Sequence, residues 1–272
     1  MPLKLSGIFI FVFMNKQPIG IFDSGVGGTS IWKEVNKLLP YENTIYLADS
    51  KNAPYGPKGK ESIINLSIKN TELLIEKGCK AIIVACNTAT TNAINTLRSK
   101  YNIPFIGIEP AIKPAALKTK TKVIGVLATK GTLSSDLFHS TSNLYSDGID
   151  IIEQEGNGIV ELIEAGKINS KSMYSLLQDY LTPMIDANID YLVLGCTHYS
   201  FLKPHLTTIL PQKVKIIDSG KAIARQTKII LAENNLLNTS TENPKLKFYT
   251  NGEIHVLFNI LNNKHIVQHL DF

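Results

Sequence analysis

The chain contains two halves that carry similar motifs in the same order. KAIIVACNT (80–88) matches DYLVLGCTH (190–198), so that Cys86 lies over Cys196. Two further pairs follow the same order at nearly the same offset of about 110 residues: PIGIFDSGVGG with VIGVLATKGT, and IPFIGIEP with KVKIIDS. This repetition predicts a duplicated structural unit.

Each unit is predicted to be an α/β domain, because short apolar runs alternate with amphipathic stretches. In the first half, strands are predicted at 19–22, 44–48, 81–85 and 105–108, and helices at 29–39, 61–77 and 88–100. Such alternation indicates βαβ units and a parallel sheet with helices on both faces. We therefore expect two pseudo-symmetric, doubly wound domains. Open α/β sheets bind ligands at the carboxyl ends of their strands, so the active site is expected in the cleft between the domains.

The repeat also predicts where the domains begin and end. Residues 15–110 are expected to form the first domain and residues 111–221 the second. Residues 222–272 are expected to return to the first domain, because both copies of the unit are then complete. Residues 1–14 precede the first motif. Their apolar stretch lacks the cleavage site of a signal peptide and is too short to span a bilayer, so we expect a non-functional extension.

The composition argues against several classes of partner. The net charge of +5 comes from scattered lysines without a basic run or a nucleic-acid motif, so neither nucleic acid nor a membrane is an expected partner. The three cysteines show neither a disulfide framework nor a zinc-binding spacing. We therefore expect a cytoplasmic protein without a metal site.

Two of the cysteines are candidates for chemistry. Cys86 and Cys196 each occupy a predicted strand-to-helix junction, where a helix N-terminus favours the thiolate and lowers the thiol pKa. Three chemistries remain open: a redox pair, a nucleophile with a helper thiol, and proton removal from one face of a carbon atom with proton return on the other. Thiols on facing walls suit the third. Cys79 is expected to be a packing residue.

The glycine-rich loop DSGVGG admits two interpretations. A dinucleotide fingerprint would use Asp49 as the ribose-binding acid, but Ser30 stands where the third glycine is needed. Alternatively, the glycines allow a tight turn whose N–H groups face a small anion. Asp23 and Ser24 would then face the cleft.

In this order, FDSGVGG, APYG, VACNTAT, LATKGT and GCTHYS resemble the cofactor-independent glutamate racemases of the aspartate/glutamate racemase family. The resemblance covers nearly all of the chain from Pro18. It implies a two-cysteine racemase that interconverts L-glutamate and D-glutamate and supplies D-glutamate for peptidoglycan. It further implies two α/β domains with the site between them, and neither pyridoxal phosphate nor a metal.

The resemblance also implies roles for individual residues. Cys86 is expected to act on D-glutamate with Asp23 as its orienting group, and Cys196 on L-glutamate with His198 beside it. Residues expected to line the substrate are Asp23, Ser24, Tyr55, Gly56, Asn87, Thr88, Thr197 and His198. The family's acid in the second domain matches Glu164, and Glu161, one turn away, is the alternative.

Two departures from the family pattern weaken the local alignment. Gly156-Asn157 replaces the family's common Cys-Pro, and Ser200 replaces its proline after CTHY. Two other functions stay open: racemisation of aspartate or another small α-acid, and a non-catalytic glutamate-binding regulatory module. A homodimer is also left open.

Overall fold

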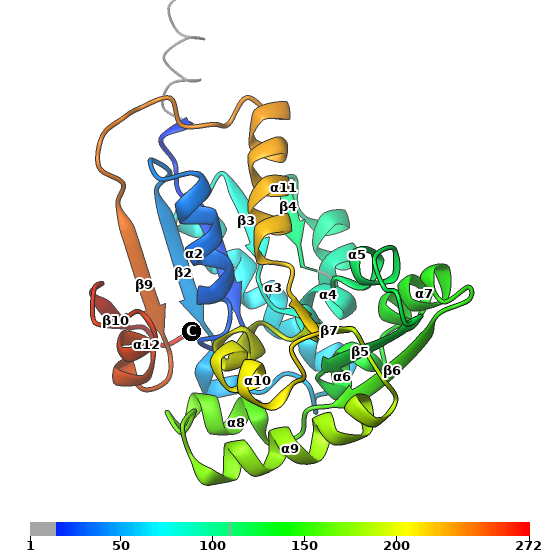
Figure 1. Cartoon of the computed structure of the whole chain (residues 1–272). Coiled ribbons are helices and arrows are strands. Elements are labelled where there is room, and N and C mark those ends of the chain that lie inside the picture. The colour runs from blue at the N-terminus through cyan, green and yellow to red at the C-terminus, as the bar shows by residue number, and fades with distance from the viewer. Residues whose placement is uncertain (1–14, 109) are drawn as a thin grey trace, which may run out of the picture.

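The computed structural model describes residues 15–108 and 110–272. The expectation for residues 1–14 therefore lies outside the described residues. Within these ranges the chain forms two parallel sheets, a larger one at the upper left of Figure 1 and a smaller one at the lower right.

The first sheet has six parallel strands in the order β10-β9-β2-β1-β3-β4. These strands are β1 (Ile19–Asp23), β2 (Thr44–Ala48), β3 (Ala81–Val84), β4 (Phe105–Gly107), β9 (Leu246–Thr250) and β10 (Val267–His269). Every residue of β1, β2 and β3 is buried. Continuous apolar runs of this kind are typical of strands that are covered on both faces.

Helices supply that cover. Side chains of α2 and α11 pack with Ile19 and Ile21 on one face, and side chains of α3 and α4 pack with Phe22 on the other. The helical segments around this sheet are α2 (Thr29–Leu38), η1 (Ser50–Asn52), α3 (Lys60–Glu76), α4 (Asn87–Lys100), α11 (Gly220–Glu233) and α12 (Ile254–Ile260).

The second sheet repeats the central part of the first. Its parallel order β6-β5-β7-β8 corresponds to β2-β1-β3-β4. The strands are β5 (Val123–Ala128), β6 (Asp150–Glu155), β7 (Tyr191–Gly195) and β8 (Lys215–Ile217), and the helical segments are α5 (Ile112–Ala116), α6 (Lys130–Leu133), α7 (Asp136–Tyr145), α8 (Ile159–Glu164), α9 (Lys171–Asp186), η2 (Thr197–Leu202) and α10 (Lys203–Ile209). The predicted fold class, two doubly wound parallel α/β units, is confirmed.

After the second sheet the chain contributes two strands to the first sheet. β9 pairs with β2, with Leu246 opposite Thr44, and β10 pairs with β9. The division into 15–110 with 222–272 and 111–221 stays a prediction. The sequence patterns missed two edge strands: β6, whose residues are all at least partly exposed, and β10, which has three residues.

Three fully buried tyrosines anchor loops at the carboxyl ends of the strands. Their hydroxyl groups donate hydrogen bonds to Gly25 C=O (Tyr46, 2.7 Å), to the Asp49 carboxylate (Tyr55, 2.5 Å) and to Gly156 C=O (Tyr199, 3.0 Å). A Cβ atom at Gly156 would lie 2.3 Å from the Tyr199 hydroxyl oxygen. Glycine at this departure from the family pattern therefore leaves room for the tyrosine.

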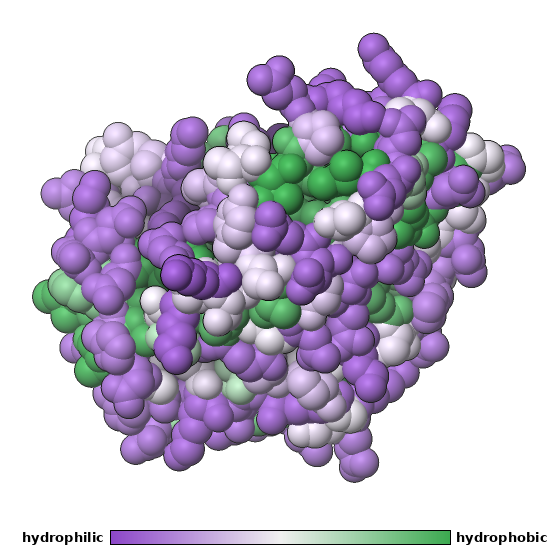
Figure 2. Space-filling model, turned by 60° about the horizontal axis from the view of Figure 1, so that its bottom comes forward, coloured by the Kyte–Doolittle hydropathy of each residue, from purple (hydrophilic) through white to green (hydrophobic). Residues whose placement is uncertain are grey.

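The face in Figure 2 is largely hydrophilic, with a hydrophobic area toward its upper right. Each helix in the described ranges is too short or too polar to cross a lipid bilayer.

Candidate active site

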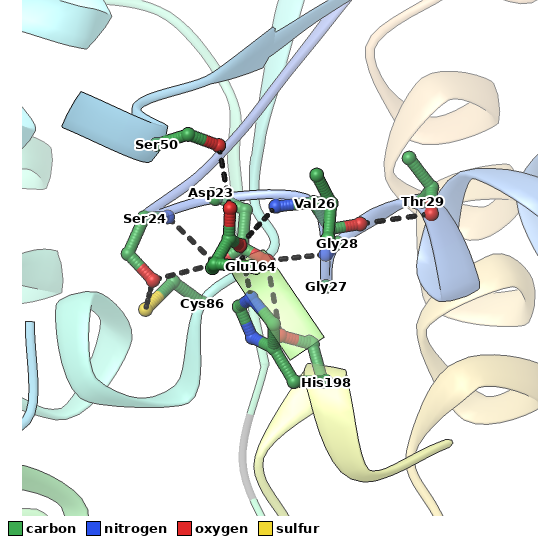
Figure 3. Close-up of polar contacts among 12 residues, drawn as sticks. Asp23, Ser24, Val26, Gly27, Gly28, Thr29, Ser50, Cys86, Glu164 and His198 are labelled. Atoms are coloured by element: carbon green, nitrogen blue, oxygen red, sulfur yellow. Dashed lines mark hydrogen bonds and ion pairs between the residues drawn. The ribbon is translucent and has the colours of Figure 1, made fainter. Parts of the chain in front are cut away.

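Cys86 belongs to the first sheet and is held at the start of a helix. It follows β3 and is the N-cap of α4, where its Sγ accepts the N–H of Ala89 at 3.4 Å. The thiol lies 3.6 Å from the Ser24 hydroxyl oxygen, to which it donates, and it is buried. The chain thus brings the thiol beside the DSGVGG loop after β1, as Figure 3 shows.

The environment of Cys86 disfavours the thiolate. Burial, followed by the negative charge of Asp23, raises the pKa of Cys86, and the lowering effects of the Ala89 N–H and the Ser24 hydroxyl are smaller. The prediction that the helix N-terminus lowers this thiol pKa is therefore wrong, because desolvation outweighs the helix N-terminus. The charge of Cys196 also contributes to the increase.

Cys196 occupies the equivalent place in the second sheet, after β7 and before η2. Its Sγ lies 3.8 Å from Nδ1 of His198, and both side chains are buried. On the other side of the ring, Nε2 lies 2.6 Å from Oε1 of Glu164. Burial disfavours the imidazolium, but the hydrogen bonds with Cys196 and Glu164 and the negative charges of these two groups together outweigh burial and raise the pKa of His198 well above its usual value.

Glu164 connects the two sheets. It ends α8 of the second unit, yet it accepts hydrogen bonds from the Val26 N–H (2.7 Å) and the Ser50 hydroxyl (2.8 Å) of the first unit. Figure 3 shows its carboxylate between these donors and His198. The alternative acid, Glu161, is exposed on the same helix. Of the two candidates, Glu164 is the one that contacts His198.

Asp23 also bridges the units. Its fully buried carboxylate accepts hydrogen bonds from the N–H groups of Ser24 (2.7 Å) and Gly28, and from the Thr197 hydroxyl (3.0 Å) of the second unit. Burial raises the pKa of Asp23, against the lowering effects of the His198 charge and the Thr197 hydrogen bond. Asp23 affects the pKa of Cys86 through its charge, whereas the side chain that this thiol contacts directly is that of Ser24.

The glycines of DSGVGG permit this contact between units. A Cβ atom at Gly25 would lie 1.9 Å from a Glu164 carboxylate oxygen, and one at Gly27 would lie 2.3 Å from Nδ1 of His198. The expectation that this loop turns its N–H groups toward a small anion requires correction. The N–H groups of Ser24, Val26 and Gly28 donate to carboxylates of the protein itself.

Ser30, which breaks the dinucleotide fingerprint, has a structural partner of its own. Its hydroxyl donates to Thr197 C=O (3.2 Å) and to Gly27 C=O (2.8 Å). Ser30 therefore ties the glycine-rich loop to the segment that carries Thr197 and His198.

A second group of contacts between the units surrounds Thr88. Its hydroxyl oxygen lies 2.8 Å from that of Thr129 and 3.3 Å from that of Thr132. Thr129 and Thr132 lie in LATKGT but were not among the residues selected from the sequence. Their position in the repeat, equivalent to the DSGVGG loop, was the available signal.

Asn87 differs from its neighbours, because neither its side-chain oxygen nor its nitrogen has a hydrogen-bond partner among the described residues. The residue is only 3% exposed. Buried amide groups are almost always paired. An unpaired amide beside Cys86 therefore indicates a place for a polar ligand.

The loop with Tyr55 and Gly56 completes the group of predicted residues. The Tyr55 hydroxyl donates to Asp49 and accepts from the Asn70 amide at 3.1 Å. A Cβ atom at Gly56 would lie 3.0 Å from Cβ of Thr129. This loop therefore packs against the second unit at the same junction.

Comparison with known proteins gives the family. A model of the Asp/Glu/Hydantoin racemase family matches residues 20–227. The chain belongs to the Asp/Glu/Hydantoin racemase family. A glutamate racemase of Herpetosiphon aurantiacus is 43% identical over 240 residues, which cover 88% of this chain and 94% of the relative.

Two solved structures agree with this membership. The glutamate racemase of Francisella tularensis in complex with D-glutamate has a TM-score of 0.81 and 31% identity, and covers 94% of this chain and 98% of that one. The Escherichia coli glutamate racemase in complex with L-glutamate and the activator UDP-MurNAc-ala has a TM-score of 0.82 and 31% identity, and covers 93% and 98%. The predicted resemblance to glutamate racemases is confirmed, and the protein is an enzyme of the racemase class.

The close approach at Gly27 leads to a prediction. Gly27→Ala should lower racemase activity at least about tenfold, because a methyl group 2.3 Å from Nδ1 of His198 displaces the imidazole from Cys196. Gly59→Ala is the matched control, since no atom lies within 4 Å of the added Cβ there. Steady-state kinetics of both variants check this. Equal activity of the two would show that His198 is not held against the loop.

Proposed function

We propose that this protein interconverts L-glutamate and D-glutamate by a two-base reaction at Cα. One cysteine thiolate removes the proton and the other cysteine thiol returns a proton to the opposite face. The observation that carries the proposal is the equivalence of Cys86 and Cys196. Both are buried, and each has its own polar partners. Cys86 follows β3 and Cys196 follows β7, which are equivalent strands of the two units. The relatives crystallised with D-glutamate and with L-glutamate support the choice of substrate.

The proposed direction of each thiol follows the family pattern. Cys196 removes the proton from L-glutamate while Cys86 donates its own proton, which gives D-glutamate and leaves Cys86 as the thiolate. The reverse reaction starts from that state. Exchange with solvent resets the two thiols, so no atoms are gained or lost by the enzyme.

The surroundings of Cys86 strengthen that thiolate as a base, whereas those of Cys196 place a cation beside the thiolate. A Cα–H beside a carboxylate is a very weak acid, and a thiolate is a weak base in water. Burial and the charge of Asp23 disfavour the Cys86 thiolate and so strengthen it as a base. On the other wall, protonated His198 stabilises the thiolate of Cys196, whose Sγ it faces at 3.8 Å.

Polar groups at the junction of the units are proposed to hold the substrate. Asn87 offers a side-chain amide without a partner among the described residues, and three hydroxyls lie near the cysteines. Ser24 contacts Cys86, Thr88 follows Asn87 in α4, and Thr197 follows Cys196 in η2. Such donors stabilise negative charge as it moves onto the carboxylate during proton removal. Asp23, His198 and the loop of Tyr55 and Gly56 complete the proposed binding residues.

The cellular setting is proposed from the same assignment. D-Glutamate made by this reaction would supply peptidoglycan synthesis. The three cysteines are free, as suits a reducing cytoplasm, and we propose that location. Assembly as a homodimer stays a prediction, and sedimentation of the purified protein tests it.

The first prediction concerns the cysteines. Cys86→Ala and Cys196→Ala should each abolish racemisation, because each direction needs one base and one acid. Cys79→Ala is the matched control and should retain activity, since Cys79 precedes β3, at the opposite end of that strand from Cys86, and packs in the hydrophobic core. Circular dichroism of each enantiomer of glutamate and aspartate, without added cofactor, measures the rates.

Three outcomes would contradict the proposal. Racemisation that survives the loss of either cysteine excludes the two-base reaction. Faster turnover of aspartate than of glutamate makes the protein an aspartate racemase. Binding of glutamate without turnover makes it a regulatory module.

The second prediction concerns Asn87. Asn87→Ala should raise KM for glutamate at least about tenfold, since a hydrogen bond to a charged group contributes about 1.5–3 kcal/mol. Without glutamate, its free energy of unfolding should stay within about 1 kcal/mol of wild type, because the lost amide is unpaired.

Asn43→Ala should behave in the opposite way. The Asn43 side chain donates to Lys16 C=O (2.6 Å) and accepts from the Lys245 N–H (2.7 Å). Asn43 precedes β2, at the amino end of the parallel strands, whereas Cys86 follows the carboxyl end of β3. This variant should lose stability and keep its KM. An unchanged KM in Asn87→Ala would remove Asn87 from the binding residues.

A further inference from the structure

Ser50 is the first residue of η1, separated from the end of β2 by Asp49, and its hydroxyl contacts the second unit. It donates a 2.8 Å hydrogen bond to Oε2 of Glu164, 114 residues away in the chain. Figure 3 shows Ser50 on the opposite side of the Glu164 carboxylate from His198. The residue was not among those selected from the sequence.

The donors of the Glu164 carboxylate are divided between its two oxygens. Oε1 accepts the Val26 N–H at 2.7 Å and faces Nε2 of His198 at 2.6 Å, while Oε2 accepts the Ser50 hydroxyl. The terminal torsion of a glutamate side chain has broad energy wells. A donor on Oε2 therefore limits rotation of the carboxylate and keeps Oε1 in line with the imidazole.

Ser50 is itself held by neighbouring segments of the first unit. A Cβ atom at Gly252 would lie 2.7 Å from Cβ of Ser50, so the chain after β9 packs closely against it. The next residue, Lys51, donates its N–H to the Asn251 side chain at 2.9 Å. The preceding residue, Asp49, donates its N–H to Asp23 C=O at 3.0 Å. The hydroxyl thus projects from a fixed backbone.

His198, the group at the end of this chain of contacts, is faced by ionisable side chains from three elements. Glu164 approaches from α8, Cys196 from the end of β7, and Asp23 from the end of β1. Glu164 and Cys196 are the hydrogen-bond partners among them. The orientation of the Glu164 carboxylate therefore bears directly on the imidazole that faces Cys196.

We propose that Ser50 is a positioning residue of the racemase, which acts through Glu164 to fix protonated His198 beside Cys196. It does not contact the reacting thiols. This inference rests on the proposed function for its catalytic consequence, whereas the arrangement of Ser50, Glu164 and His198 can be tested without turnover.

The test combines NMR titration of His198 with kinetics on Ser50→Ala. In the full-length protein without substrate, the His198 ring signal, assigned with His198→Asn, should titrate about one pH unit or more lower in Ser50→Ala than in wild type. The value of kcat for glutamate should fall about tenfold, with KM changed less than about twofold. Because the proposed function uses His198 in its cationic form, the alkaline limb of the kcat profile should move to lower pH.

Ser200→Ala is the matched control. The Ser200 hydroxyl also donates to a carboxylate, Asp218, at 3.0 Å, but that carboxylate does not contact His198. This variant should leave the His198 titration and kcat unchanged. In a Glu164→Gln background, Ser50→Ala should cause no further change in either quantity, because its effect passes through the carboxylate.

The outcomes separate the two proposals. An unchanged or higher His198 pKa in Ser50→Ala overturns the role of Ser50. So does a loss of kcat on Ser50→Ala that is as large in the Glu164→Gln background as in the wild-type protein. If the wild-type protein does not racemise glutamate, the proposed function fails, while the NMR titration still decides whether Ser50 controls His198.

Discussion

The burial of charged side chains away from water is the constraint on which this site depends. Asp23 and His198 are buried where the carboxyl ends of two parallel sheets meet, and a buried charge needs a partner. Asp23 finds a partner across the junction in Thr197. His198 finds one in Glu164 of its own unit, whose carboxylate in turn accepts donors from the first unit. The glycines at 25 and 27 follow from this arrangement, because any side chain there would collide with Glu164 or His198.

The duplicated fold places two similar thiols in different surroundings. Cys86 faces the Ser24 hydroxyl and lies in the field of a carboxylate, whereas Cys196 faces an imidazole whose proton is held by Glu164. Two enantiomers present their protons on opposite sides of one carbon. The asymmetry of the two walls gives each proposed proton transfer its own acid–base partners on an otherwise repeated scaffold.

Much of the fold could be predicted from the sequence, because β3 and β7 are continuous apolar runs, followed by Cys86 and Cys196 respectively. The half-exposed edge strand β6 was not predicted, since its alternation of apolar and polar residues is weak and its ends are acidic. The direction of the Cys86 pKa shift was predicted wrongly, because burial depends on packing from both units. Ser50 and Thr129 were missed for a similar reason: their partners, Glu164 and Thr88, are distant in the chain.

The fate of the Cα proton in D₂O tests the central claim most directly. With L-glutamate as substrate, D-glutamate formed in the first turnovers should carry deuterium at Cα, because Cys86 delivers a solvent-exchanged proton. The remaining L-glutamate should carry almost none at that stage. Mass spectrometry of the separated enantiomers measures both. Substantial protium in the early product would mean that one group both removes and returns the proton, which contradicts a site with two opposed thiols.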